Sequence, residues 1–166
     1  AAATELMSQQ SFAPRSVLEL ERVHDFWLLL NQPERANQFL QAHRTAALQA
    51  DDRSSADTEV RLALSDIQSR LEFDPASAVP LLLPTAQAMS ALPHDLDIDG
   101  YWSGWHAMAH KAQAWDAAEA GLDLQRTRER NDPDNDSAQA YGDAMTLVRK
   151  AELAHQRGDA ARAAQQ

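Results

Sequence analysis

The sequence predicts an all-α fold in which antiparallel helical hairpins stack side by side, with about seven helices and the start of an eighth. The first observation is a recurring pattern in which an alanine follows a turn and, in three copies, a leucine follows four residues later. Its alanines are Ala36, Ala78, Ala118 and Ala163, which lie 42, 40 and 45 residues apart, and its leucines are Leu40, Leu82 and Leu122. The second observation is a composition rich in helix-forming residues, with five glycines and no run that alternates β-branched with polar residues.

The first hairpin is expected between residues 16 and 50. Ser16 and Glu19 have the spacing of a capping box, which predicts a helix that begins after Ser16 and runs to about residue 30. Pro33 suits the first position of the next helix, which is expected to end near Ala50. The residues expected to face inward are Val17, Leu20, Val23, Trp27, Leu30, Ala36, Phe39, Leu40, Ala47 and Leu48. The polar residues 51–57 are expected to form a linker.

The second hairpin contains the least regular helix. A helix is predicted over 57–72, because apolar residues recur there at helical spacing. These residues are Val60, Leu64, Ile67 and Leu71. The next helix is expected to begin at Pro75, but Pro80 and Pro84 fall inside it and each removes a backbone donor. We therefore expect a kinked or delayed helix that ends near Leu92.

The third hairpin is predicted from a helix over 101–115 and a following helix that ends at about Arg126. The first of these carries a stripe of residues at helical spacing, expected to be buried. The stripe consists of Tyr101, Trp105, Met108, Ala112 and Trp115. Residues 130–136 predict a polar turn, and a further helix is expected over 137–157, with Gly158 as its C-terminal stop.

The ends of the chain suggest a domain within a longer protein. Residues 1–15 are expected to form a loose leader, and residues 16–166 a single domain. The last hairpin is expected to be cut, since its second helix begins after Gly158 and the sequence stops at Gln166. An opening without methionine is equally compatible with a mature end left by signal-peptide cleavage and with a sequence that was cut from a longer chain.

Composition excludes several classes of function. The net charge of −10 makes a nucleic-acid partner unfavourable, because an acidic surface repels phosphate backbones. The absence of cysteine excludes disulfides, zinc–thiolate sites and thiol nucleophiles. No stretch of the sequence approaches the roughly 20 apolar residues of a membrane span, so direct membrane insertion is not expected. The sequence also lacks a Gly-rich phosphate loop and a serine nucleophile elbow, which argues against an enzyme.

The repeated pattern resembles the tetratricopeptide (TPR) family, in which each repeat pairs two antiparallel helices. The family motif places Trp or Leu early in the first helix, then a turn, then Ala followed by Leu or an aromatic residue in the second. The matching positions are Leu20, Ala36 and Leu40; Leu62, Ala78 and Leu82; Trp102, Ala118 and Leu122; and Leu147, Gly158-Asp159 and Ala163. The match is degenerate, since the period is longer and the small residue of the first helix is replaced by His24, Asp66 and His106. The sequence is similar to the TPR-like sensor regions of bacterial signalling proteins, some of which are periplasmic.

The resemblance implies that the first helices line a groove for a peptide or protein partner. Carried over residue by residue, it places the following side chains towards that groove: Asp25, Leu28, Arg70, His110, Lys111, Glu152 and His155. Trp102 is also expected to face the groove, independently of the resemblance, because it is offset from the buried stripe and Gly104 leaves room beside it. The alternative for the aromatic residues is ordinary core packing, and the alternative for the charged ones is a solvated face.

Two local motifs are candidates for binding a cation. Asp95, Asp97 and Asp99 alternate before a glycine, as in the first half of a calcium loop. The twelfth position of such a loop should be a bidentate Glu but is His106, so an acidic connection with Asp99 as a helix cap is favoured. His106 and His110 lie one helical turn apart and could share zinc, but no third ligand is evident in the sequence. No metal or cofactor is therefore expected.

The sequence favours a non-catalytic protein-interaction or sensory module of a larger bacterial signalling protein, with a slight preference for the periplasm over the cytoplasm. One alternative is a small-ligand or metal-ion sensor that uses the Asp95–Gly100 loop or the His106/His110 pair. A second alternative is a structural module that forms a homodimer.

Overall fold

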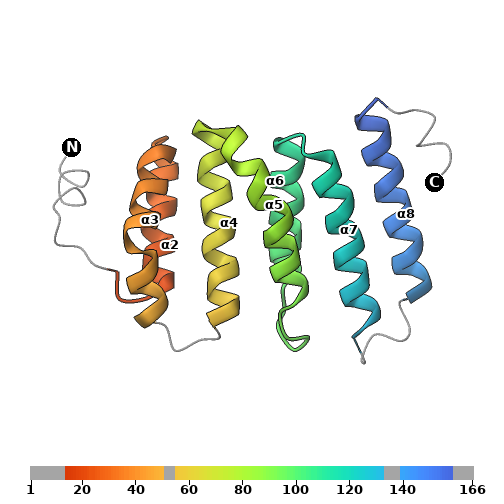
Figure 1. Ribbon diagram of the computed structural model, residues 1–166, viewed down its shortest axis with the longest axis horizontal. Helices are drawn as coiled ribbons and strands as arrows, with labels where there is room; N and C mark the ends of the chain where they lie inside the picture. Colours follow the sequence, from red (N-terminus) through yellow and green to blue (C-terminus); the bar gives the residue numbers. More distant parts are fainter. Residues whose placement is uncertain (1–13, 51–54, 133–138, 159–166) are drawn as a thin grey trace.

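The computed structural model describes residues 14–50, 55–132 and 139–158, and within these residues the chain is all-α, as predicted (Figure 1). It contains seven helices and no strand in this part of the chain. The helices are α2 (Val17–Leu29), α3 (Pro33–Ala50), α4 (Ser55–Phe73), α5 (Pro75–Ser90), α6 (Asp99–Lys111), α7 (Trp115–Arg130) and α8 (Gln139–Gln156).

The helices form a row in which consecutive members run up and down alternately (Figure 1). We call α2, α4, α6 and α8 the first helices and α3, α5 and α7 the second helices. Among the first helices, α2 packs against α4 and α4 packs against α6. Among the second helices, α5 packs against α7, whereas the backbones of α3 and α5 do not approach within 8 Å. Helix α8 packs against α7 alone among the described helices.

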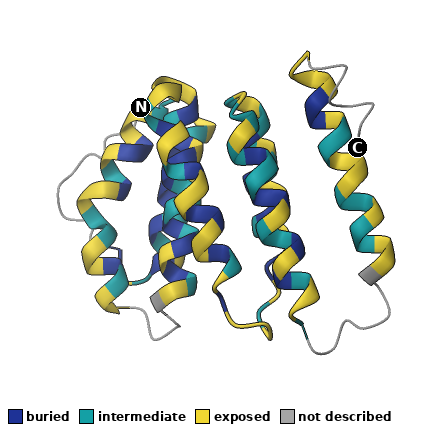
Figure 2. Ribbon diagram, turned by 45° about the vertical axis from the view of Figure 1, so that its right-hand side comes forward, coloured by how far each residue is buried: buried dark blue, intermediate teal, exposed yellow. Residues whose placement is uncertain are grey.

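The apolar core lies between the two sets of helices and is largest over α4–α7. Its largest cluster includes Ile67, Leu82, Met89 and Trp105, all fully buried, and smaller clusters lie between α2, α3 and α4. Figure 2 shows buried positions along the facing sides of these helices, and few along α8. Burial of this apolar surface is the main favourable term that holds the helices together.

The start of the first hairpin is as predicted. The Ser16 side chain accepts a hydrogen bond from the Glu19 backbone N–H at 3.2 Å and so caps α2. The Glu19 carboxylate accepts instead from the backbone N–H of Arg15, one residue before the expected partner. The inward set is confirmed except at Leu30, which is 40 % exposed because α2 ends before it.

Helix α5 is not delayed by its two internal prolines. It starts at Pro75, with only Asp74 between it and the end of α4, continues through Pro80 and Pro84, and bends after its first turns (Figure 1). Both prolines lie on the exposed side of α5. The carbonyls that they leave without a helical donor therefore face water, which can satisfy them.

The helix predicted over 101–115 begins two residues earlier and ends four residues earlier than expected, and its stripe meets the core, with Trp105 fully buried and the other four members partly buried. Helix α6 begins at Asp99 and stops at Lys111, and Gln113 then adopts a left-handed conformation with φ 53°. Trp115 therefore belongs to α7, and the buried residues of α6 are Trp102, Trp105 and Ala109. Asp99 lies inside the first turn rather than capping the helix, whose cap residue is Ile98.

Trp105 is the centre of the core of this region. Its indole is fully buried, and its Nε1–H donates to the carbonyl of Leu82 at 2.8 Å. A Cβ on Gly121 of α7 would lie 2.2 Å from two ring carbons of Trp105. Glycine at position 121 is therefore what lets α6 and α7 approach across the indole.

Helix α7 is one turn longer than predicted and ends at Arg130 rather than near Arg126. The last turn is supported by Arg128, whose buried guanidinium donates to the carbonyls of Leu92 and Pro93 after the end of α5. Helix α4 likewise starts at Ser55, two residues earlier than expected. Across the described residues, no helix combines the length and the apolar character that a membrane span requires.

Several sequence predictions fall outside the described residues. They concern residues 1–13 of the leader, 51–54 of the linker, 133–136 of the polar turn and 159–166 of the eighth helix. Pro14, at the end of the predicted loose leader, is described and is buried.

Candidate functional site: a groove between α6 and α8

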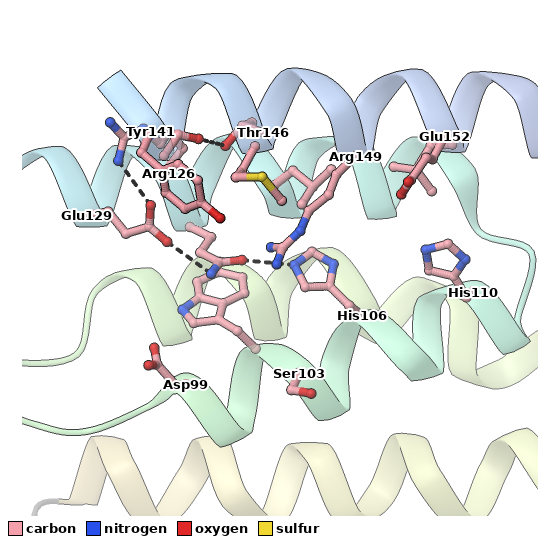
Figure 3. A pocket seen from close by; sticks show the side chains of 16 residues that line it. Asp99, Ser103, His106, His110, Arg126, Glu129, Tyr141, Thr146, Arg149 and Glu152 are labelled. Carbon is pink, nitrogen blue, oxygen red and sulfur yellow. Dashed lines mark hydrogen bonds and ion pairs between the residues drawn. The ribbon is translucent and has the colours of Figure 1, made fainter. Parts of the chain in front are cut away.

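A groove separates the first helices α6 and α8. The backbones of these two helices do not approach within 8 Å, unlike those of α2 and α4 or of α4 and α6. The space between them has a volume of about 680 Å³, with α6 and α8 as its walls and α7 as its floor. Figure 3 shows side chains from all three helices directed into it. The groove therefore lies where α8 would contact α6 if the packing of α2 on α4 and of α4 on α6 continued along the row.

The α6 wall is aromatic. Trp102 is 3 % exposed, and its ring centroid lies 6.1 Å from those of Trp105 and His106. The His106 ring stands edge-on to Trp105, with centroids 5.1 Å apart. These contacts fix the orientation of the His106 ring between two indoles.

His106 is held as a neutral imidazole. Its Nε2 lies 3.0 Å from Oε1 of Gln125 on α7, so Nε2 carries the proton and donates to that amide oxygen. Burial lowers the pKa of His106; the Gln125 hydrogen bond opposes this shift, and the charge of Arg149 adds to it. The ring therefore contributes no positive charge to the groove at neutral pH.

One corner of the groove is an ion-pair cluster that attaches α8 to α7. The buried Arg126 donates from Nε to Asp143 at 2.6 Å and from Nη1 to Glu129 at 3.0 Å. Asp143 raises the pKa of Arg126, and Arg126 followed by Arg130 lowers the pKa of Asp143. A Cβ on Gly142 would lie 2.5 Å from Nη1 of Arg126, so this glycine leaves room for the guanidinium.

Two charged residues of α8 lie in the groove without an ion pair among the described residues. Arg149 lies near the His106 ring in Figure 3, and the charge of Arg149 acts on that ring. Glu152 lies one turn further along α8, beside His110 (Figure 3). Neither residue takes part in the salt bridges found in the described part of the chain. Their charges are therefore accessible to a ligand.

The structure brings three of the eight predicted partner-binding residues together in this groove, namely Trp102, His110 and Glu152. Trp102 lines the groove although it is almost completely buried. His155 is exposed near the end of α8, outside the groove lining.

The other four predicted partner-binding residues lie elsewhere and have intramolecular contacts. Asp25 contacts His24, Leu28 packs on the α2–α3 core, Arg70 binds Asp66 and Ser77, and Lys111 pairs with Glu72. Arg70 and Lys111 thus have acidic partners that the sequence pattern did not reveal.

The candidate metal ligands do not form a cluster. Among the described residues, no group of three or more His, Asp or Glu side chains is placed to hold an ion. Asp95, Asp97 and Asp99 are exposed, and Asp97 Oδ1 accepts from the Asp99 backbone N–H at 3.3 Å. His106 and His110 both line the groove, but the Nε2 of His106 is already bound to Gln125.

Sequence reasoning missed the residues that give the groove its charge, chiefly Arg126, Glu129 and Arg149. Their roles depend on which helices face each other, and helix periodicity does not report that. One signal in the sequence does group the α8 residues. Met145, Thr146, Arg149 and Glu152 follow one another at helical spacing and therefore lie on neighbouring turns of one face of α8.

Comparison with protein-family models, with curated proteins and with solved structures finds no significant match to this chain.

Proposed function

We propose that this domain is a non-catalytic protein-interaction module that holds a segment of a protein partner in the groove between α6 and α8. The observation that carries the proposal is the missing contact between these two first helices, together with the mixed surface that lines the space. Partner segments of this kind bind through a few apolar anchors and a few charges.

The lining suits a chain segment. The apolar part of the lining consists of the half-buried Met145 and the almost completely buried Trp102 and Leu122, while Arg149 and Glu152 supply opposite charges one turn apart. These groups are spread along two helices instead of converging on one point, and the Tyr141 side chain at one end is 72 % exposed. A site for a compact small molecule would instead surround its ligand with a few converging polar groups.

The geometry gives little support to catalysis. His106 is the ring best placed to act as a base, but its Nε2 donates to the neutral amide of Gln125. Ser103 lines the same groove, and no hydrogen bond joins it to His106 among the described residues. A nucleophile and its base need such a bond.

A sensory role in a larger bacterial signalling protein extends this proposal. Helix α8 packs on α7 alone among the described helices, so a segment that enters between α6 and α8 would press on a helix with few other restraints. A change in the tilt of α8 would then report the bound state. The compartment, with the periplasm preferred, stays a prediction.

A peptide selection tests the proposal. A phage-displayed library of random 12-residue peptides is panned on the immobilised domain, and enriched peptides are synthesised with a fluorescent label. We expect micromolar affinities by fluorescence anisotropy, and a loss of about tenfold or more in Ser103→Trp, which fills the groove. Ser103 is exposed and has no hydrogen bond among the described residues, so this change leaves the core intact.

Ala107→Trp is the matched control, because Ala107 is exposed on the same helix but lies outside the groove lining. It should bind the peptides as the wild type does. Selected peptides that bind all three proteins equally, or a selection that enriches nothing, would remove the groove as the binding site.

A further inference from the structure

The groove continues at the N-terminal end of α6 into a smaller acidic hollow. The hollow has a volume of about 280 Å³ and shares Trp102, Asp99, Gln125 and Glu129 with the groove. We call Asp97, Asp99, Glu129 and Asp132 the acidic end. Arg128 also lines this hollow, but its guanidinium donates to two backbone carbonyls. Glu129 is bound by Arg126, and the other three carboxylates outnumber the one further cation that lines this end, so a basic side chain is the complementary ligand.

The middle of the groove has the opposite sign. Arg149 lies beside the neutral His106 ring, and it forms no ion pair among the described residues although Glu152 follows one turn later on α8. The other groove cation, Arg126, is bound to Asp143 and Glu129. An acidic side chain is the ligand that complements Arg149, because a guanidinium binds a carboxylate in bidentate geometry.

The apolar residues of the groove lining are Met145, which is half-buried, and Trp102 and Leu122, which are almost completely buried. Trp102 lies at the boundary of the acidic hollow and the groove, and Met145 and Leu122 line the groove. An apolar side chain in this position would exclude water from both flanking ion pairs, which strengthens them.

We propose that the groove selects a bipolar segment of a protein partner, with a basic side chain at the acidic end, an apolar side chain over Trp102 and Met145, and an acidic side chain at Arg149. This inference rests on the proposed function and specifies the chemistry of the partner. A uniformly basic segment would place a cation against Arg149, and a uniformly acidic one would meet the four carboxylates. The order of charge along the groove thus selects against both.

The spacing of the two charges follows from α6. Asp99 precedes His106 by two turns of this helix, which corresponds to about 10 Å along its axis. A partner in extended conformation spans this distance in about three to four residues, and its side chains alternate between its two faces. The expected pattern is therefore a basic and an acidic residue four positions apart with an apolar residue midway between them, so that all three side chains face the groove, whichever direction the segment runs.

Four labelled 12-residue peptide pools test the charge rule. Each pool has a random apolar residue at its central position and carries Lys/Glu, Lys/Lys, Glu/Glu or Gln/Gln at the two positions that flank it two residues away on either side, which are four apart. Affinities for the wild-type domain are measured by fluorescence anisotropy at low and at moderate salt. We expect the Lys/Glu pool to bind about tenfold or more tightly than the other three, with the advantage reduced at the higher salt concentration.

Charge reversal in the domain should change the preference in a predictable direction. Arg149→Glu should favour the Lys/Lys pool, and Asp99→Lys should favour the Glu/Glu pool. Arg22→Glu and Glu59→Lys are the matched controls, since both residues are exposed on other helices and neither has an ion pair among the described residues. These controls should leave the order of the four pools unchanged.

The outcomes separate this inference from the proposed function. If Ser103→Trp abolishes binding of every pool but the four pools bind the wild type equally, the groove binds peptides and the charge rule is wrong. Binding that Ser103→Trp leaves unchanged overturns both. A preference for Lys/Lys in the wild type overturns the role of Arg149 and attributes binding to the net charge of the domain.

Discussion

The two ends of the row of first helices differ in how they are closed. On the N-terminal side, side chains bridge neighbouring first helices directly: Arg61 of α4 pairs with Glu21 of α2, and Tyr101 of α6 donates to Asp57 of α4 at 2.8 Å. On the C-terminal side, in the described part of the chain, no hydrogen bond or ion pair joins α6 to α8. Both helices are instead bonded to α7, through His106 with Gln125 and through Asp143 with Arg126.

This difference indicates where the domain can admit a ligand. Closing a first-helix interface needs complementary side chains that meet, as Glu21 and Arg61 do. At the open interface, α8 presents Arg149 near His106 and Glu152 beside His110, and no such pair forms among the described residues. A partner that supplied the missing charges would complete the interface, which is a physical reason for binding at this position.

The largest expected effect is in the closed centre. Trp105→Ala should lower the free energy of unfolding by about 3–5 kcal/mol, because it removes a fully buried indole. Chemical denaturation followed by circular dichroism measures this change. Tyr141→Ala is the matched control at the open end, where the ring is 72 % exposed, and it should cost well under about 1 kcal/mol. Equal losses in the two variants would mean that the centre is no more tightly packed than the groove.

A pair of identical glycine substitutions sharpens the comparison. Gly121→Ala should destabilise the domain by about 1–3 kcal/mol, since its Cβ would lie 2.2 Å from ring atoms that the core holds in place. Gly142→Ala meets only the end of the Arg126 side chain, so its gain in helix propensity should offset most of the strain. We expect a net change within about 1 kcal/mol there.

Denaturation midpoints of the two variants, measured side by side, test this difference. The variant Gly121→Ala/Trp105→Phe should recover part of the loss, because the smaller ring leaves space for the methyl group. Destabilisation by Gly142→Ala as large as that by Gly121→Ala would show that α8 is held as rigidly as α6.

The sequence predicted the helices well where local signals decide them. The Ser16 cap and Pro33 mark helix ends, and the buried set of α2 and α3 follows from apolar periodicity. It placed the end of α6 too late, because the apolar series continues to Trp115, which packs on the same core from the first position of α7. Only the left-handed turn at Gln113 separates the two helices, and glutamine gives no local signal for that conformation.

The candidate site was only partly predictable for a different reason. His110 and Glu152 followed from their positions on first helices, and those positions are a local property. Trp102 was chosen because it was expected to be offset from the buried stripe, whereas it is itself only 3 % exposed. The proposed role of Arg149 depends on its having no ion pair among the described residues, whereas Arg70 and Lys111 find partners on neighbouring turns or helices. The pairing of charges is decided by packing between helices, which one sequence does not reveal.

Acidification should weaken the closed interface more than the open one. Burial lowers the pKa of His24, which is completely buried with an unpartnered Nε2, and burial also lowers that of His106. The unfolded chain therefore binds more protons below about pH 6.5, so stability is full above that pH and falls as the pH drops towards the lowered values. Each histidine contributes a slope of at most about 1.4 kcal/mol per pH unit.

Free energies of unfolding between pH 7.5 and 5.5 measure this slope. His24→Gln should flatten it more than His106→Gln does, since His24 is the more deeply buried of the two by surface exposure. The slope is the readout because either substitution also changes the baseline stability. A profile that His24→Gln leaves as steep as the wild type would exclude His24 as the source.

The smallest expected effect is that of metal ions. The melting temperature of the chelator-treated domain should shift by less than about 1 °C on addition of calcium or zinc. An ion that bound the folded domain and was present at 100 times its Kd would raise the free energy of unfolding by about 2.7 kcal/mol, which would move the melting temperature by several degrees. The three loop carboxylates are exposed, and one of them accepts from the backbone of another. A rise of several degrees with zinc that is lost in His110→Gln would overturn the contrast between the closed first-helix interfaces and the open one between α6 and α8. Since His106, His110 and Glu152 all line the groove, such an ion would bridge α6 to α8, and the open interface would be the apo form of a metal-closed one.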